Sequence, residues 1–126
     1  MSYTFKIETD KKYIHVITVG DLITNEVVAM GLEIMLKAKM LKYNILYDHR
    51  LSNNRISISE AYHWYSTHYD NIDIVLRRIP TAYIANKEDW DFFSFFECTC
   101  YNKGIPIRAF LEECEAVKWL NTKISI

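Results

Sequence analysis

The stretch Asn44-Ile45-Leu46-Tyr47-Asp48-His49-Arg50, which continues through Leu51–Arg55 to Ser57-Ile58-Ser59-Glu60, decides the expected fold. It predicts a short buried strand over Ile45–Tyr47, then a polar loop, then the start of a long helix. Ser57 and Glu60 have the spacing of a capping box, in which each side chain accepts from the other residue's backbone N–H. Ligands of open α/β sheets usually bind beyond the carboxyl ends of parallel strands, so a site is expected here first.

Upstream, the sequence predicts two strands and a helix. Tyr3–Glu8 alternates between apolar and polar residues, which is typical of a half-buried strand. Tyr13–Val19 is nearly continuous in apolar character and predicts a deeper, antiparallel partner that ends at Gly20-Asp21. Thr24 is the expected N-cap of a helix that reaches about Leu41.

Two apolar rows follow the first helix. The row expected to face the core contains Val27, Gly31, Ile34, Ala38 and Leu41, with Gly31 allowing a close approach to the sheet. The second row contains Leu32, Leu36 and Met40, turned well away from the first. Two interpretations of the second row stay open: another element of the same domain covers it, or it is the surface for a second subunit or a protein partner.

Downstream, the pattern predicts three more helices and two more strands. The expected elements are a continuous helix from Ser57 to about Arg78, a strand over Thr81–Ala85, a helix over Asp89–Asn102, an edge strand over Ile105–Phe110 and a helix over Glu112–Asn121. The order β-β-α-β-α-β-α-β-α predicts a single α/β domain over residues 1–126. Its mixed five-stranded sheet should have an antiparallel first strand, while the strand order stays open.

Charge, cysteine content and hydropathy limit the partners and the compartment that the sequence predicts. With 15 basic and 16 acidic residues the net charge is -1, which argues against nucleic acid as a partner. The three cysteines match no disulfide or zinc spacing, so reduced thiols are expected. Because no signal peptide and no apolar run of membrane-spanning length is visible, we expect a cytoplasmic protein without an integral membrane segment.

The element order and the tail Gly104–Leu120, with its Ala116-x-x-Trp119-Leu120 helix, resemble the STAS-like superfamily, in particular proteins similar to stage II sporulation protein AA (SpoIIAA-like). The strand end at Asp48 and the strand Ala82–Ala85 carry the rest of this resemblance. It implies a regulatory or protein-interaction module. Relatives with a lipid-carrier-like version of the fold imply, as the alternative, a small apolar ligand.

Anti-sigma-factor antagonists of that superfamily carry a phosphorylatable Ser at the start of the helix after the third strand, a position that corresponds here to Ser57. This chain departs from their Asp-Ser-Ser/Thr-Gly motif, because Ile56 replaces the Asp and no Gly follows. The N-cap role explains Ser57 without a kinase.

No catalytic set of side chains can be assembled from the sequence. His68 and His15 lie in apolar patterns and are expected to be buried and hydrogen-bonded to backbone groups, whereas His49 and His63 are expected at the surface. Asp48 and His49 should point to opposite sides of their strand. Cys98-x-Cys100 lacks two further metal ligands. We therefore expect a non-enzymatic protein without a metal or a cofactor.

Polar residues at two strand ends form a possible loop site made of Asp48, Arg50, Ser57 and Lys87. If those strands are neighbours, Arg50 and Lys87 could face a helix N-terminus and hold an anion or a phosphorylated partner. Ordinary solvated loops are the alternative.

Aromatic residues form 14% of the chain and crowd the third helix. Phe92, Phe93 and Phe96 centre one face of this helix, and Trp90 and Phe95 flank it so widely that the apolar arc exceeds what a sheet-covering helix needs. Three interpretations stay open: an ordinary core, an oligomer or partner surface that includes Trp90 and Phe95, and a ligand pocket. The expected pocket residues are Trp64, His68, Phe92 and Phe96.

Overall fold

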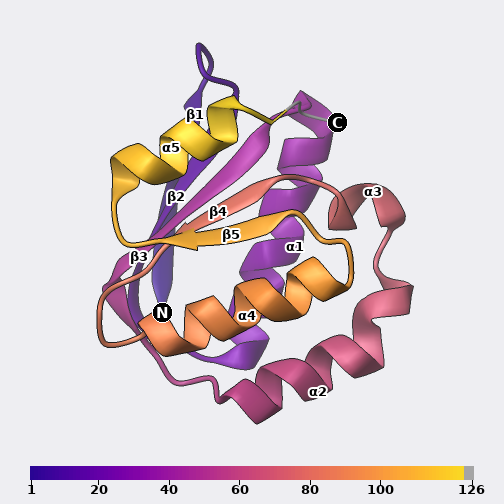
Figure 1. Ribbon diagram of the computed structural model, residues 1–126. Coiled ribbons are helices and arrows are strands. Elements are labelled where there is room, and N and C mark those ends of the chain that lie inside the picture. The colour runs from indigo at the N-terminus through magenta and orange to yellow at the C-terminus, as the bar shows by residue number, and fades with distance from the viewer. Residues whose placement is uncertain (124–126) are drawn as a thin grey trace.

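The structure, a computed structural model, describes residues 1–123 and contains a mixed five-stranded sheet with helices on both faces (Figure 1). In chain order the elements are β1 (Ser2–Glu8), β2 (Tyr13–Leu22), α1 (Thr24–Leu41), β3 (Asn44–Asn54), α2 (Ile58–His68), the 3-10 turn η1 (Tyr69–Asn71), α3 (Ile74–Arg77), β4 (Thr81–Ile84), α4 (Trp90–Asn102), β5 (Ile107–Phe110) and α5 (Glu113–Asn121). The strand order is β1-β2-β3-β4-β5, with β1 antiparallel to β2 and the other neighbours parallel. The predicted fold class and the edge position of β5 are confirmed.

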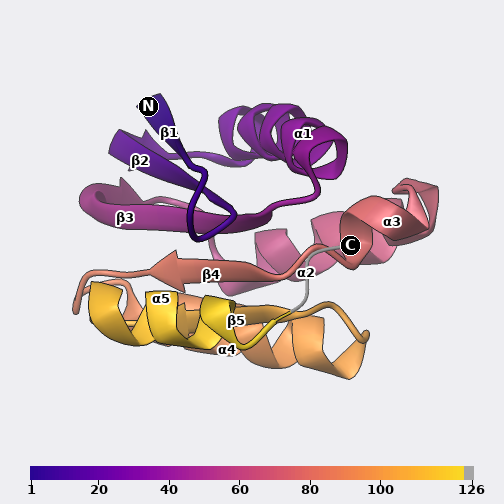
Figure 2. The same cartoon turned by 90° about the horizontal axis from the view of Figure 1, so that it is seen from above.

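The helices divide unequally between the two faces of the sheet (Figure 2). Ile45 and Tyr47 of β3 pack in one core cluster with α1 and α3, whereas Leu46 packs with Ala116 and Leu120 of α5. Successive strand residues point to opposite faces, so β3 supplies both clusters. α5 therefore covers one face, and α1 to α4 lie on the other. No helix within residues 1–123 is long and apolar enough to span a membrane.

β2 and β3 extend beyond the predicted strand ends. The predicted end at Gly20 and the predicted loop at Leu51–Asn54 are both wrong, because these segments pair with each other, from Val19 with Leu51 to Leu22 with Asn54. The register shifts between Ile17 and Val19, as at a β-bulge. Backbone pairing holds this polar extension together without the apolar alternation on which the prediction depends.

The predicted continuous helix from Ser57 to Arg78 is also wrong. The structure divides it into α2, η1 and α3. Asp73 causes the last break, because its Oδ1 atom accepts a hydrogen bond from the backbone N–H of Val75 at 2.8 Å and so caps α3. A short acidic side chain that bonds the backbone locally favours a new helix start over continuation.

The start of α1 differs from the prediction. The N-cap is Ile23, without a side-chain cap, and Thr24 is the first helical residue. The Thr24 hydroxyl instead donates to the Glu60 carboxylate of α2. Ser57 does cap α2, since its Oγ atom accepts from the backbone N–H of Glu60 at 3.0 Å. The Glu60 carboxylate thus joins two helix starts, and the reciprocal half of the predicted capping box is absent from residues 1–123.

The core row of α1 is only partly the predicted one. Ile34 and Ala38 are buried as expected, together with Met30, but Leu41 is exposed. A Cβ atom at Gly31 would meet no neighbouring atom within 4 Å. The expected close approach of Gly31 to the sheet is therefore wrong, and the helix stands over open space at this point.

Candidate functional site

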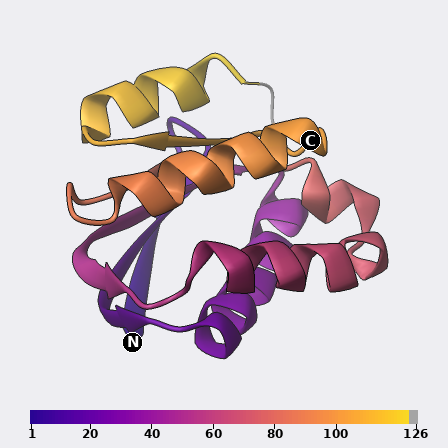
Figure 3. The same ribbon diagram turned by 60° about the horizontal axis from the view of Figure 1, so that its bottom comes forward.

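An apolar cavity of about 170 Å³ lies beside Gly31, between the sheet and helices α1, α2 and α4. Figure 3 shows these three helices side by side over the same face of the sheet. Gly31 and Val27 line the cavity from α1, and Trp64 lines it from α2. Because a glycine sits where most helices would place a side chain, the packing of α1 leaves this space free.

Three of the four predicted pocket residues line the cavity. Trp64 comes from α2, and Phe92 and Phe96 come from α4, where their rings stack with centroids 6.1 Å apart. His68 does not line the cavity and is exposed, so its expected burial is wrong. Its ring lies 4.9 Å from that of Trp64, on a helix that contains no buried residue.

An aromatic layer forms the floor of the cavity. Tyr47 of β3 and Tyr83 of β4 stack with ring centroids 5.3 Å apart. The imidazole of His49 stacks on both tyrosine rings and, at 5.4 Å, on the ring of Phe93. Burial raises the pKa of the Tyr47 and Tyr83 hydroxyls well above the ordinary value, so the floor is uncharged at neutral pH.

His49 is buried in this floor, with 3% of its surface exposed, and the expectation that it lies at the surface is wrong. The Oγ1 atom of Thr18 lies 2.7 Å from its Nδ1 atom and also 2.7 Å from the Ser52 hydroxyl. Burial lowers the pKa of His49 to about 4, against the opposing effect of the Asp48 charge. His49 is therefore a neutral ring that Thr18 holds in place.

Arg77 brings a permanent charge to the α3 side of the cavity lining. Its guanidinium carbon lies 4.4 Å from the centre of the Tyr69 ring, and the Lys103 ammonium lies 5.2 Å from the same centre. The Nε atom of Arg77 is buried and has no hydrogen-bond partner within residues 1–123. The cavity is thus apolar, with one cationic side chain, Arg77, at its edge.

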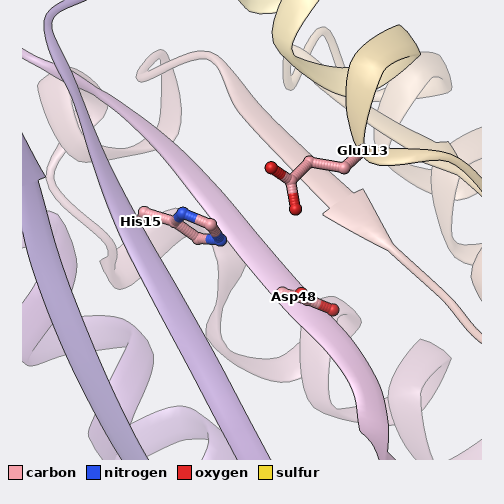
Figure 4. Close-up of side chains that lie close together, drawn as sticks. All are labelled: His15, Asp48 and Glu113. Carbon is pink, nitrogen blue, oxygen red and sulfur yellow. The ribbon is translucent and has the colours of Figure 1, made fainter.

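A second cluster lies on the opposite face of the sheet, where Glu113 of α5 reaches toward the strands that carry His15 and Asp48 (Figure 4). One ligand-type atom from each of the three residues lies within 4.8 Å of the others. Arg50 binds both carboxylates, at 3.0 and 2.7 Å to the two Asp48 oxygens and 3.0 Å to Glu113 Oε1. Burial raises the pKa of Asp48, but the hydrogen bonds from Arg50 outweigh burial and hold it below the ordinary value.

This cluster contains an ion-pair network, because the Arg50 guanidinium already supplies positive charge to the carboxylates of Asp48 and Glu113. The predicted opposite orientation of Asp48 and His49 is confirmed. His15 is half-buried, and its Nε2 atom is buried without a partner among residues 1–123. The expected backbone hydrogen bond from His15 is therefore wrong for this nitrogen.

The four residues of the predicted loop site are not all brought together. Asp48 and Arg50 pair with each other, whereas Ser57 caps α2 and Lys87 is exposed before α4. Within the described chain, no hydrogen bond or ion pair connects Ser57 or Lys87 to Arg50.

The predicted interface residues lie mostly at the surface. The exposed fractions are 42% for Leu32, 53% for Leu36, 84% for Met40 and 40% for Phe95. No element within residues 1–123 therefore buries the second row of α1, and the interpretation that the same domain covers it is wrong. Trp90 is half-buried against the cluster that contains Leu22 and Phe93.

The chain matches no family model and no curated protein. Among solved structures it is similar to an uncharacterized protein of the DUF3478 family with a SpoIIAA-like fold from Shewanella loihica PV-4. The sequence identity is 18% and the TM-score 0.48, and the match covers 94% of this chain and 92% of that chain.

Proposed function

We propose that this protein is a non-enzymatic STAS-like module that binds a small apolar ligand in the cavity between α1, α2, α4 and the sheet. The observation that carries the proposal is the cavity itself, at about 170 Å³ and lined mainly by apolar and aromatic side chains. An apolar cavity of roughly 150 Å³ is large enough to hold benzene. The cavity of this protein has room for a ligand body of that size or slightly larger.

The chemistry of the lining supports binding without catalysis. The titratable groups of the floor are His49, whose pKa is lowered by burial, and the tyrosines, whose pKa values burial raises. All of them are neutral near pH 7, and none of them is paired with a second titratable side chain of suitable pKa. The floor therefore offers stacking surfaces rather than an acid and a base.

Helix α2 offers a route by which a ligand could enter. It has no buried residue, and it touches α4 through the edge-to-face contact of Tyr65 with Phe96, at 5.4 Å between ring centroids. At its first turn, Glu60 binds the Thr24 hydroxyl of α1. Displacing α2 would therefore expose little fully buried surface, and elements of this kind open at low free-energy cost.

The test uses octanol, toluene and indole as probes, with binding followed by ligand-observed NMR and calorimetry. Gly31→Leu should abolish binding, because its side chain would extend from α1 into the cavity, while Gly31→Ala should retain it. Circular dichroism and the melting temperature establish that both variants are folded. If none of the three probes binds the wild type, or if Gly31→Leu binds as well as the wild type, the proposal is wrong.

A protein partner or a homodimer is the second candidate function, favoured by the exposed row Leu32, Leu36 and Met40 on α1. Leu36→Glu should then release monomers in sedimentation equilibrium without lowering the melting temperature. Ser66→Glu adds the same charge to the exposed side of α2 and serves as the control. A wild-type protein that is monomeric and retains no partner in native mass spectrometry would contradict this candidate.

The cysteines bear on the cellular compartment of the protein. Cys98, Cys100 and Cys114 are free thiols. Free thiols favour a reducing environment, so we propose a cytoplasmic location.

A further inference from the structure

We infer that the ligand of the cavity is an apolar monoanion whose carboxylate pairs with Arg77. This inference rests on the proposed function, because it names the chemical class of the ligand that the cavity would bind. Among the described residues that line the cavity, Arg77 is the one with a permanent charge, and no aspartate or glutamate lies beside it in that lining.

The unpartnered Nε atom of Arg77 points to a ligand. Its Nε atom is buried and makes no hydrogen bond to the described chain. Nearly all buried polar groups in proteins have a partner, because leaving one without a partner costs stability. A cationic donor at the edge of an apolar cavity is satisfied by an acceptor that enters with the ligand.

The charges around Arg77 favour an anion at this position. Arg77 and Lys103 both lie over the Tyr69 ring, and the Tyr69 hydroxyl donates to the Lys103 carbonyl at 2.9 Å. Within residues 1–123, no carboxylate oxygen forms an ion pair with Arg77 at 4.0 Å or less. The nearby Asp73 carboxylate feels the charge of Arg77 without contacting it, and it caps α3 through Val75 and pairs with Lys39 at 3.5 Å.

The geometry and the single charge of the Arg77 guanidinium favour a carboxylate over other anions. A guanidinium presents parallel N–H donors that match the two oxygens of a carboxylate. One arginine neutralises the single charge of a carboxylate, whereas a phosphate monoester would bring a second charge next to an apolar wall. The ligand therefore combines a short aliphatic or single-ring body, which fits the volume, with one terminal acid group.

The experiment compares octanoate with octanol, which share a chain and differ in the head group. Calorimetric titration of the wild type at neutral pH should give a dissociation constant about tenfold or more lower for octanoate. Arg77→Gln should remove this preference by weakening octanoate binding much more than octanol binding. Arg78→Gln is the matched control, because Arg78 is the exposed neighbour outside the cavity lining and should behave as the wild type.

The outcomes separate this inference from the proposed function. Equal or tighter binding of octanol by the wild type, or unchanged octanoate binding by Arg77→Gln, overturns the carboxylate inference and leaves apolar binding intact. Failure of the wild type to bind octanoate, octanol, toluene or indole overturns both. If Arg77→Gln does not fold, the ratio of the two wild-type dissociation constants decides, with Arg77→Lys as the variant that keeps the charge and loses the paired donors.

Discussion

The Oγ1 atom of Thr18 and the Nδ1 atom of His49 lie 2.7 Å apart beneath the floor of the cavity. This contact joins β2 to β3 at the point where both strands pass beyond the end of β4. It also fixes the ring that stacks on Tyr47, Tyr83 and Phe93. A buried neutral imidazole in this position makes the stability of the protein depend on pH.

We predict that the free energy of unfolding falls as the pH is lowered from about 6.5 to about 4. Burial lowers the pKa of His49 from 6.5 to about 4, so in this window the unfolded chain binds a proton that the folded protein does not. The loss should approach about 3 kcal/mol and be absent above pH 6.5. Urea unfolding at a series of pH values measures it. His49→Gln should flatten this part of the profile, and an unchanged slope in that variant would assign the effect to other groups.

Gly31→Ala should stabilise the protein by about 0.5–1 kcal/mol, because a glycine in a helix interior costs conformational entropy and the added Cβ meets no atom within 4 Å. The midpoint of urea unfolding measures the change. Gly104→Ala is the contrasting variant, since Gly104 has φ +75 and an alanine there is strained. If Gly31→Ala is destabilising, the space beside α1 is smaller than the structure indicates.

Arg50→Gln should destabilise the protein by about 1–3 kcal/mol, because it removes charged hydrogen bonds from the mostly buried Asp48 carboxylate. Glu113→Gln should cost less than about 1 kcal/mol, because that carboxylate is 46% exposed and water replaces the lost contact. Chemical denaturation of both variants measures the two costs. Equal costs would mean that Arg50 acts through Glu113 as much as through Asp48.

The backbone amides of α2 should exchange with deuterium faster than those of α1, since α2 has no buried residue whereas Met30, Ile34 and Ala38 anchor α1. Hydrogen-exchange mass spectrometry resolves the two helices. A ligand in the cavity should slow exchange in α2 selectively, through contact with Trp64. Equal protection of both helices from exchange would contradict the proposal that α2 moves to let the ligand enter the cavity.

Apolar periodicity is sufficient to predict the five strands along the chain, though not the ends of β2 and β3, the antiparallel β1 and the aromatic face of α4, because burial imposes that periodicity. It also placed Trp64, Phe92 and Phe96 in one pocket. His49 was missed because the polar segment after Tyr47 has the composition of a loop, although the alternation of β3 puts residues 47 and 49 on one face.

The sequence predicts Arg77 at the end of a long helix, whereas in the structure it ends the short helix α3, which Asp73 caps, and lines the cavity. Gly31 shows a different limit of sequence patterns. A glycine that lets two backbones approach and a glycine that leaves a space look identical in a sequence. What distinguishes them is the position of the atoms opposite, which depends on the packing of α1 over β2 and β3.

β3 serves both faces of the sheet at once, with Tyr47 and His49 in the cavity floor and Asp48 and Arg50 in the ion-pair network. Side chains of a strand alternate between the two faces, so the face on which each residue lies depends on the number of residues that precede it in β3. One residue inserted between Asn44 and Tyr47 would exchange the two sets, moving both charges into the apolar cavity and both rings to the opposite face. Insertion of two residues would keep each set on its own side. Homologous chains should vary in this strand by substitution and by even changes of length.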